Sequence, residues 1–135
     1  MQNVINVADF KGKKVLIVED DEVLRSLYVE LLTTEGALVD EAPDGETGWR
    51  KIHQGGYNLV ILDIVLPKKD GMEILRQLQK NKTKEANGPI VILTNLGQDS
   101  IVNQGFSLGA AGYIIKSAFN PDQVLGELKN FLTKK

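Results

Sequence analysis

The chain has 135 residues, 42% of them hydrophobic and 25% charged, and a formal net charge of −2. These values fit one globular domain with a single core, and they argue against a strongly basic nucleic-acid surface. The absence of cysteine excludes a disulfide framework, a thiol nucleophile and a Cys-ligated zinc site. No apolar run has the length of a membrane span and the N-terminus has no signal-peptide pattern, so we expect a cytoplasmic protein without membrane association.

Strand-like and helix-like segments alternate after a mixed segment, residues 1–12, which we interpret as an N-terminal extension to a domain spanning 13–135. Apolar runs predict strands at 15–18, 37–42, 59–62, 90–93 and 112–115. Helical spacing of apolar residues predicts helices at 23–32, from 72 onward, around 101–108 and from 121 onward. Pro43-Asp44-Gly45 is predicted to open a short second helix that runs through Trp49 and Ile52 and is closed by Gly55-Gly56. Asp70 and Asn120 are predicted to cap the third and fifth helices. The alternation predicts an α/β fold, a single-domain, doubly wound parallel sheet with five helices on its two faces.

Polar residues follow four of the five predicted strands. Glu19 and Asp20 come after the first strand, Asp63 after the third, Thr94 ends the fourth and Lys116 follows the fifth. In a parallel sheet these ends lie on one edge, where open α/β sheets bind ligands, so we expect the side chains to meet in one cleft. Taken singly, each has an ordinary explanation, such as a helix cap or a solvated charge. Independent caps need not fall at successive strand ends, which favours a functional site.

The residue types at this edge fit phosphoryl transfer. Neighbouring carboxylates repel one another unless a cation lies between them, and an all-oxygen donor set suits a hard divalent ion such as Mg²⁺. Lys116 adds a positive charge and Thr94 a hydroxyl donor, the groups needed to balance charge on phosphoryl oxygens. Asp63, the single acid after the central strand, is the predicted nucleophile.

The sequence from about 13 to 133 resembles the CheY-like receiver domains of two-component response regulators. The resemblance rests on the acidic run EDD after the first strand, the loop DIVLPKKDG, Thr94 at the end of the fourth strand, and GYIIK, with an aromatic residue three places before the lysine. It implies the flavodoxin-like strand order 2-1-3-4-5, phosphorylation of Asp63 and a role for Lys116 in binding the phosphoryl group. Mg²⁺, with Mn²⁺ as a substitute, would be bound by Glu19, Asp20, Asp63 and the Val65 carbonyl.

The resemblance also implies a switch. The threonine hydroxyl, here Thr94, moves toward the phosphoryl group, and an aromatic side chain, here Tyr113, turns inward behind it. The donor would be a histidine kinase or a phosphotransfer protein, and the output a change at the surface of the fourth helix, fifth strand and fifth helix. No output domain follows Lys135, so we expect either an effector protein in trans or a chain that is a fragment of a larger protein. Such a protein is not a turnover enzyme, does not contact nucleic acid directly and can form a weak homodimer.

Several positions bear on how such a switch would behave. Ser117 follows the lysine where most relatives have proline, so the geometry of that peptide bond is left open. Asn95 stands where relatives usually have a small residue, and it either narrows the entrance or donates a hydrogen bond to the phosphoryl group. Val65 and Leu96 flank the path of the attacking water in the family. Because neither side chain can orient water through a hydrogen bond, we expect slow dephosphorylation.

Three other functions fit the same fold class. A phosphatase of the haloacid dehalogenase type also uses a strand-end aspartate, but it needs a second aspartate two residues later, where this chain has Val65. Nucleotide or flavin binding needs a glycine-rich phosphate loop after the first strand, where this chain has acids. A phosphorylation-independent protein-binding module has no need of Asp63, Thr94 and Lys116 together. The phosphorylated switch is therefore the leading hypothesis.

Overall fold

Five parallel strands form one sheet in the order β2-β1-β3-β4-β5 within residues 9–132, the part of the chain that this computed structural model describes. Residues 1–8 of the expected extension and residues 133–135 lie outside the described residues. The strands are β1 (Lys14–Val18), β2 (Leu38–Ala42), β3 (Leu59–Leu62), β4 (Ile90–Thr94) and β5 (Gly112–Ile115). The helices are α1 (Glu22–Thr34), α2 (Gly45–Gln54), α3 (Gly71–Lys80), α4 (Asp99–Ser107) and α5 (Pro121–Lys129). The predicted fold class and strand order are confirmed.

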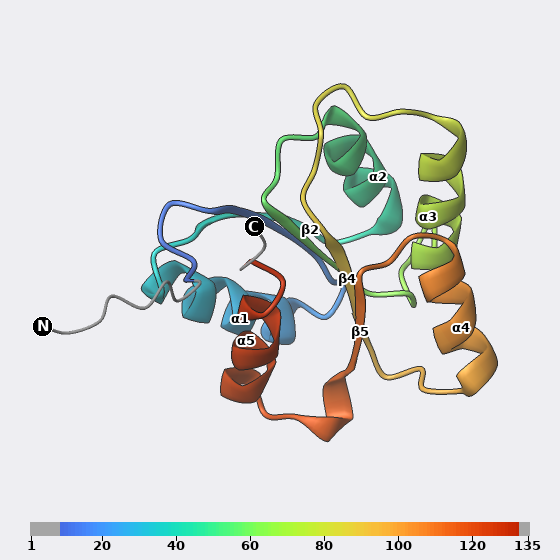
Figure 1. Ribbon diagram of the computed structural model, residues 1–135. Helices are drawn as coiled ribbons and strands as arrows, with labels where there is room; N and C mark the ends of the chain where they lie inside the picture. Colours follow the sequence, from blue (N-terminus) through green and yellow to red (C-terminus); the bar gives the residue numbers. More distant parts are fainter. Residues whose placement is uncertain (1–8, 133–135) are drawn as a thin grey trace, which may run out of the picture.

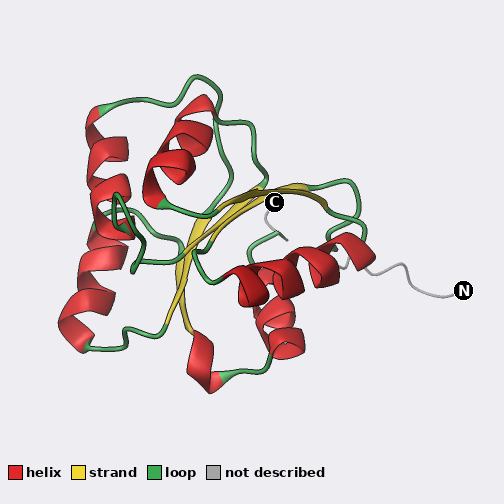
Figure 2. Cartoon of the chain, turned by 180° about the vertical axis from the view of Figure 1, so that it is seen from behind, coloured by secondary structure: helices red, strands yellow, loops and turns green. Residues whose placement is uncertain are grey.

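Helices cover both faces of the sheet. α1 and α5 lie on one face and α2, α3 and α4 on the other (Figure 1), and Figure 2 shows the sheet between these two groups. The central strand β3 is buried on both sides: Leu59 and Ile61 belong to the core cluster beneath α1 and α5, and Val60 and Leu62 to the opposite cluster. This two-sided burial explains why β3 is an uninterrupted apolar run in the sequence.

The segment before β1 contributes to the core. Phe10 is 0% exposed and belongs to the cluster on the α1 and α5 side. The residues interpreted as an N-terminal extension, 1–12, therefore include at least one core side chain. The boundary between extension and domain stays a prediction.

Strand register brings the functional residues to one edge. β1 pairs with β3, and β4 with β5, in parallel, and each pair ends with its last residues side by side. Loops therefore leave the sheet at the same C-terminal edge, which is the ligand-binding edge of such sheets. The polar residues that end these strands or directly follow them are Glu19, Asp63, Thr94 and Lys116.

Side-chain caps begin α1, α2, α3 and α5, whereas α4 has no side-chain cap. Asp70 accepts a backbone hydrogen bond in the first turn of α3 at 2.9 Å, and Asn120 and Gln123 form a reciprocal capping box at the start of α5, as the sequence predicts. Asp21, the third acid of the EDD run, caps α1 at 3.0 Å. None of the helices within residues 9–132 is long and apolar enough to cross a membrane.

The turn after β5 holds a feature that the sequence does not predict. Residues Lys116–Ala118 form a short 3-10 helix, η1, before the chain extends toward α5. The peptide bond between Lys116 and Ser117, left open by the sequence, is trans, as are the other peptide bonds of the described residues.

Candidate functional site

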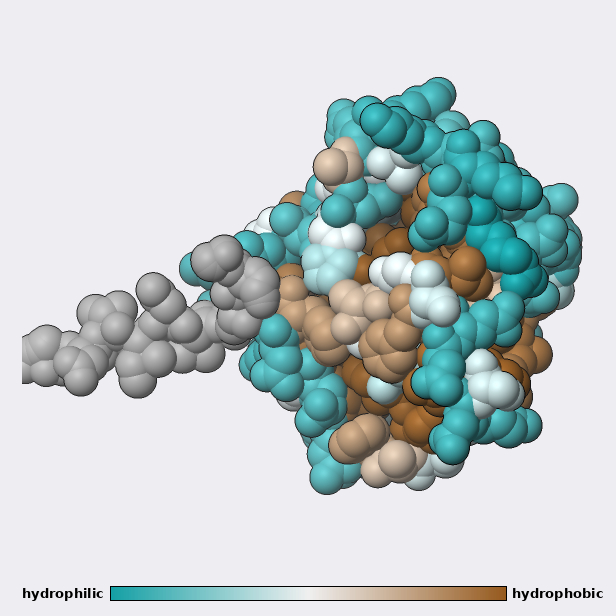
Figure 3. Space-filling model, turned by 45° about the vertical axis from the view of Figure 1, so that its right-hand side comes forward, coloured by the Kyte–Doolittle hydropathy of each residue, from teal (hydrophilic) through white to brown (hydrophobic). Residues whose placement is uncertain are grey.

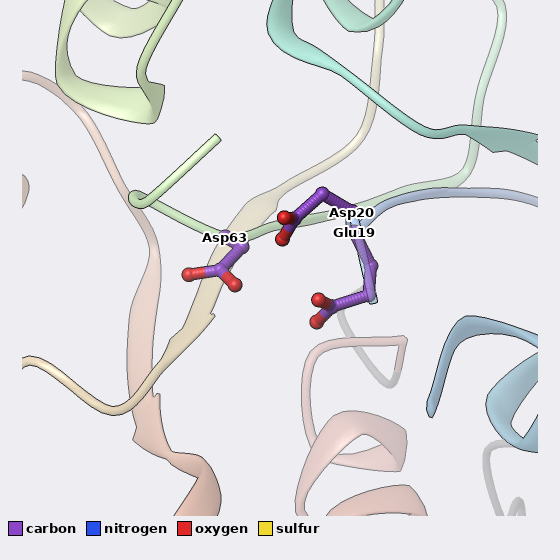
Figure 4. Close-up of side chains that lie close together, drawn as sticks. All are labelled: Glu19, Asp20 and Asp63. Carbon is purple, nitrogen blue, oxygen red and sulfur yellow. The ribbon is translucent and has the colours of Figure 1, made fainter. Parts of the chain in front are cut away.

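Three carboxylates gather at the C-terminal edge of the sheet (Figure 4). Glu19 and Asp20 come from the loop between β1 and α1, and Asp63 follows β3; one oxygen of each lies within 4.8 Å of the others. Glu19 and Asp63 are 2% and 5% exposed, whereas Asp20 is open to solvent. The acids expected to meet at this edge do lie together.

Lys116 joins two of these acids. Its Nζ lies 2.7 Å from Asp63 Oδ2 and 2.5 Å from Glu19 Oε1, and its side chain is 12% exposed. Burial alone would lower the pKa of Lys116, but its hydrogen bonds to Asp63 and Glu19 raise that pKa above the ordinary value. Burial raises the pKa of Glu19, and the hydrogen bond from Lys116 offsets only part of this effect. The lysine is therefore a firmly protonated cation that balances two buried acids.

The loop after β3 fixes the orientation of Asp63. Its Oδ1 accepts hydrogen bonds from the Ile64 amide at 2.7 Å and the Val65 amide at 3.3 Å, while Oδ2 faces Lys116. The loop folds back on itself because the Gly71 amide donates to the Ile64 carbonyl at 2.8 Å. A side chain at Gly71 has no room, since a Cβ there would lie 2.3 Å from the Asp63 carbonyl oxygen. The carboxylate is thus held at both oxygens.

Thr94 and Tyr113 both contact the backbone of Leu96, in the loop after β4. The Thr94 side chain is buried, and its Oγ1 lies 3.5 Å from the Leu96 amide. The Tyr113 hydroxyl donates to the Leu96 carbonyl at 2.5 Å, and its ring lies 6.3 Å from that of Phe106 on α4. Burial, and then the negative charge of Asp63, raise the pKa of Tyr113. The predicted switch pair is therefore connected through one loop residue.

These groups line a pocket of about 320 Å³ that contains Glu19, Asp20, Asp63, Thr94 and Lys116, with Asp21, Val65, Asn95 and Leu96 completing its wall. The donor set fits Mg²⁺, because the acids supply hard oxygen ligands and the solvent-exposed side of the cluster leaves room for bound water. A neighbouring cleft of about 440 Å³, between the loop after β3 and α4, is mainly apolar. The ionisable groups are concentrated in the smaller pocket.

Two contacts at the site are not predicted by the sequence reasoning. Arg25 on α1 donates to the Glu19 carbonyl at 2.9 Å and to the Glu41 carboxylate at 2.8 Å, which ties the acidic loop to β2. The Asn95 side chain accepts a hydrogen bond from the Ser117 amide at 2.9 Å, which ties the loop after β4 to η1. No residue pattern signals the first contact, because Arg25 and Glu41 lie 16 positions apart on different elements. No sequence pattern signals the second, because it depends on two loop conformations.

Curated relatives are similar over most of this chain. Transcriptional regulatory protein ResD of Bacillus subtilis (strain 168) is 34% identical over 121 residues, which cover 90% of this chain and 48% of ResD. Protein RcaC of Microchaete diplosiphon is 36% identical over 123 residues, which cover 90% of this chain and 18% of RcaC. The chain thus spans about half the length of ResD and a smaller part of RcaC.

Solved structures share the fold. A CheY-like response regulator receiver domain protein from Methanospirillum hungatei JF-1 matches with a TM-score of 0.78 and 29% identity, covering 90% of this chain and 94% of that one. Response regulator TrrA of Thermotoga maritima, solved in complex with Mg²⁺ and BeF, matches with a TM-score of 0.73 and 33% identity, covering 89% of this chain and 99% of that one. The family model of the response regulator receiver domain matches residues 15–129. The chain therefore belongs to the response regulator receiver domain family.

Proposed function

We propose that this protein is a signalling switch that accepts a phosphoryl group on Asp63 from a histidine kinase or a phosphotransfer protein. The observation that carries the proposal is the pairing of buried Asp63 with Lys116 at 2.7 Å, in a pocket that also contains Glu19, Asp20 and Thr94. A nucleophilic carboxylate, a cation and a hydroxyl donor are the groups that phosphoryl transfer needs. Membership of the receiver domain family supports the same reading.

In the transfer, one oxygen of the Asp63 carboxylate attacks the phosphorus atom of a phosphohistidine. An O–P bond forms and the P–N bond breaks, and the electron pair of the broken bond returns to the histidine nitrogen. The product is an aspartyl phosphate. Lys116, already in contact with Asp63, then binds a phosphoryl oxygen, and the backbone amides of Ile64 and Val65 keep the carboxylate oriented. The residues of the pocket thus orient the nucleophile and balance charge.

Mg²⁺, or Mn²⁺ in its place, would be held by Glu19, Asp20, Asp63 and the Val65 carbonyl. Bound there, the ion would supply positive charge that offsets the negative charge on the phosphoryl oxygens. The close approach of the three carboxylates supports this assignment, because three acids within 4.8 Å favour a cation among them. The Mg²⁺ in the related TrrA structure is consistent with it.

Phosphorylation would change the surface formed by α4, β5 and α5. The phosphoryl group attracts the Thr94 hydroxyl, and the loop through Leu96 links that movement to Tyr113. Hydrogen bonds to a charged group contribute about 1.5 to 3 kcal/mol each, and a shift from 1:99 to 99:1 needs roughly 5.5 kcal/mol. Two or three new phosphoryl contacts are therefore enough to move the equilibrium.

The partner of this surface would be an effector protein in trans. Figure 3, which brings the α3 and α4 side forward, shows hydrophobic residues in the middle of the molecular surface with hydrophilic ones around them. Phe106 on α4, 47% exposed and in ring contact with Tyr113, is an apolar contact point on this side. We propose a cytoplasmic protein without direct contact to nucleic acid or membrane, and at most a weak homodimer.

A turnover phosphatase is the second candidate function, and the geometry gives it little support. Val65, two residues after the nucleophile, is 57% exposed and offers no proton donor where a general acid would be needed. Multiple turnover of a phosphate monoester by the purified protein would revive this candidate.

The proposed function is tested by intact-mass spectrometry after incubation with acetyl phosphate and Mg²⁺. The wild-type chain should gain one phosphoryl group, and Asp63→Asn should gain none. Removing the divalent ion with a chelator should suppress the gain in the wild type. A wild-type chain that stays unmodified with Mg²⁺ present would refute the proposal.

A further inference from the structure

The loop after β4 and the turn after β5 are joined by a side chain. Asn95 Oδ1 accepts a hydrogen bond from the Ser117 amide at 2.9 Å, and the two residues are 22 positions apart in the chain. Both segments border the pocket, one directly after Thr94 and the other directly after Lys116. This bond therefore connects two parts of the wall that surrounds Asp63.

The rules of hydrogen bonding identify which atom of the Asn95 side-chain amide contacts Ser117. A backbone N–H can only donate, so the Asn95 atom that meets Ser117 must be the carbonyl oxygen. The amide nitrogen is then the other branch of the side chain. Ser117 is essential to this assignment, because a proline in its place would have no N–H to donate.

The side-chain amide nitrogen of Asn95 can donate a hydrogen bond to a ligand in the pocket. Asn95 lines the same pocket as Asp63 and Lys116, and its side-chain nitrogen has no hydrogen-bond partner among residues 9–132. The side chain is open to solvent, so this nitrogen needs no protein partner until a ligand enters. The phosphoryl group on Asp63 would bring acceptor oxygens into this pocket.

We propose that Asn95 is a further phosphoryl-binding residue, whose carbonyl oxygen is anchored by Ser117 while its amide N–H₂ donates a hydrogen bond to an oxygen of the phosphoryl group. The inference rests on the proposed function and deepens it. Asn95 adds a donor beside Lys116 and Thr94, and through Ser117 it ties the phosphoryl group to η1 at the start of the connection to α5. The phosphoryl group is thus linked to the turn after β5 through Asn95 and Ser117, independently of Tyr113.

The test measures the affinity for beryllofluoride, which mimics a phosphoryl group on aspartate, by calorimetry at saturating Mg²⁺. Asn95→Ala should bind beryllofluoride about tenfold more weakly than the wild type, the loss expected for one hydrogen bond to a charged group. Its affinity for Mg²⁺ alone should equal that of the wild type. Ser117→Ala keeps the backbone donor and is the matched control, expected to bind both ligands like the wild type.

A second variant at position 95 separates the contact with Ser117 from the hydrogen bond to the phosphoryl group. Asn95→Asp keeps an acceptor for Ser117 but replaces the donor with a negative charge, so it should bind beryllofluoride more weakly than Asn95→Ala does. Wild-type beryllofluoride affinity in either variant would overturn the inference. A loss of Mg²⁺ affinity in Asn95→Ala as large as its loss of beryllofluoride affinity would also overturn it, because Asn95 would then only shape the loop. A wild-type chain that binds no beryllofluoride at all would instead overturn the proposed function, because Asn95 is intact there.

Discussion

Lys116 Nζ lies 2.7 Å from Asp63 Oδ2, although 53 residues separate the two in the chain. The parallel sheet makes this contact, because β3 and β5 end at the same edge with β4 between them. The same ammonium group lies 2.5 Å from Glu19, so one cation serves two buried acids. The site is therefore organised around a charge balance that a bound metal ion would change.

Replacing Lys116 with methionine should destabilise the protein when no divalent ion is present. Glu19 and Asp63 would face each other in a buried site without their cation, and breaking a buried ion pair in this way costs about 3 to 5 kcal/mol. Mg²⁺ should restore part of the loss, and it should stabilise Lys116→Met more than the wild type. The free energy of unfolding in urea, with and without Mg²⁺, measures both effects.

Lys129→Met is the matched control for that variant. Lys129 pairs with Glu35 at 3.1 Å, but the two side chains are 36% and 41% exposed, so this pair should contribute less than about 1 kcal/mol. The increase in the stability of Lys129→Met on adding Mg²⁺ should equal that of the wild type. Equal losses in the two variants would contradict the charge-balance account.

Gly71→Ala should destabilise the protein by about 2 kcal/mol or more, because the added Cβ would lie 2.3 Å from the Asp63 carbonyl oxygen. The clash is with backbone, so the loop that orients Asp63 must move, and phosphorylation should slow as well. Gly126→Ala, in α5, has nothing within 4 Å of its Cβ and should stabilise the protein by up to about 1 kcal/mol. Thermal unfolding should show a lower midpoint temperature than the wild type for Gly71→Ala and a higher one for Gly126→Ala.

The fold and the main site residues follow from simple sequence rules. Buried parallel strands are apolar runs, and their C-terminal ends share an edge, so Asp63, Thr94 and Lys116 could be brought together without coordinates. Asp70 and Asn120 cap their helices because both have side-chain oxygens just before a helical pattern.

Other features depend on loop conformations that no residue pattern encodes. The bond between Asn95 and Ser117 requires the shape of two loops at once, and the bond from Arg25 to the Glu19 carbonyl requires the path of the acidic loop. Phe10 lies in a short segment that mixes polar and apolar residues, so its burial could not be assigned from a periodic pattern. The functional groups therefore follow from residue patterns, whereas the contacts that fix their positions do not.

Asp40 should make the stability of the protein sensitive to acid. Burial alone would raise the pKa of Asp40, but hydrogen bonds from Lys51 and Tyr57, each at 2.7 Å, hold it below its ordinary value of 3.8. Because the folded-state pKa is lowered, the stabilisation is present above pH 3.8 and is lost as the pH falls through the lower folded-state value.

Asp40→Asn should remove this contribution. The difference in the free energy of unfolding between the wild type and the variant should be largest above about pH 5 and should shrink below about pH 4. Glu30→Gln, at an exposed position on α1, is the control and should follow the wild-type pH profile. A wild-type minus Asp40→Asn difference that is the same at pH 6 and pH 3 would show that the ionisation of Asp40 does not affect stability.

Val65→Asn should shorten the lifetime of the phosphorylated protein by about tenfold, because an amide that orients water by one hydrogen bond lowers the barrier by roughly 1.4 kcal/mol. Val65 is 57% exposed at the wall of the pocket, so the new side chain has access to water there. Val23→Asn, 81% exposed and outside the pocket, should leave the lifetime unchanged. A time course of intact mass measures the decay, and a wild-type lifetime of seconds would contradict the expected slow hydrolysis.

The identity of the phosphorylated residue is the most direct test of the account. After treatment with acetyl phosphate and Mg²⁺, the acyl phosphate can be reduced with borohydride, which converts the modified aspartate to homoserine, and the position can be read by peptide sequencing in a mass spectrometer. Homoserine should be found at position 63 alone and should be absent when the divalent ion is removed. Homoserine at position 20, or none at any position in a folded wild-type protein, would contradict the assignment of Asp63 as the acceptor.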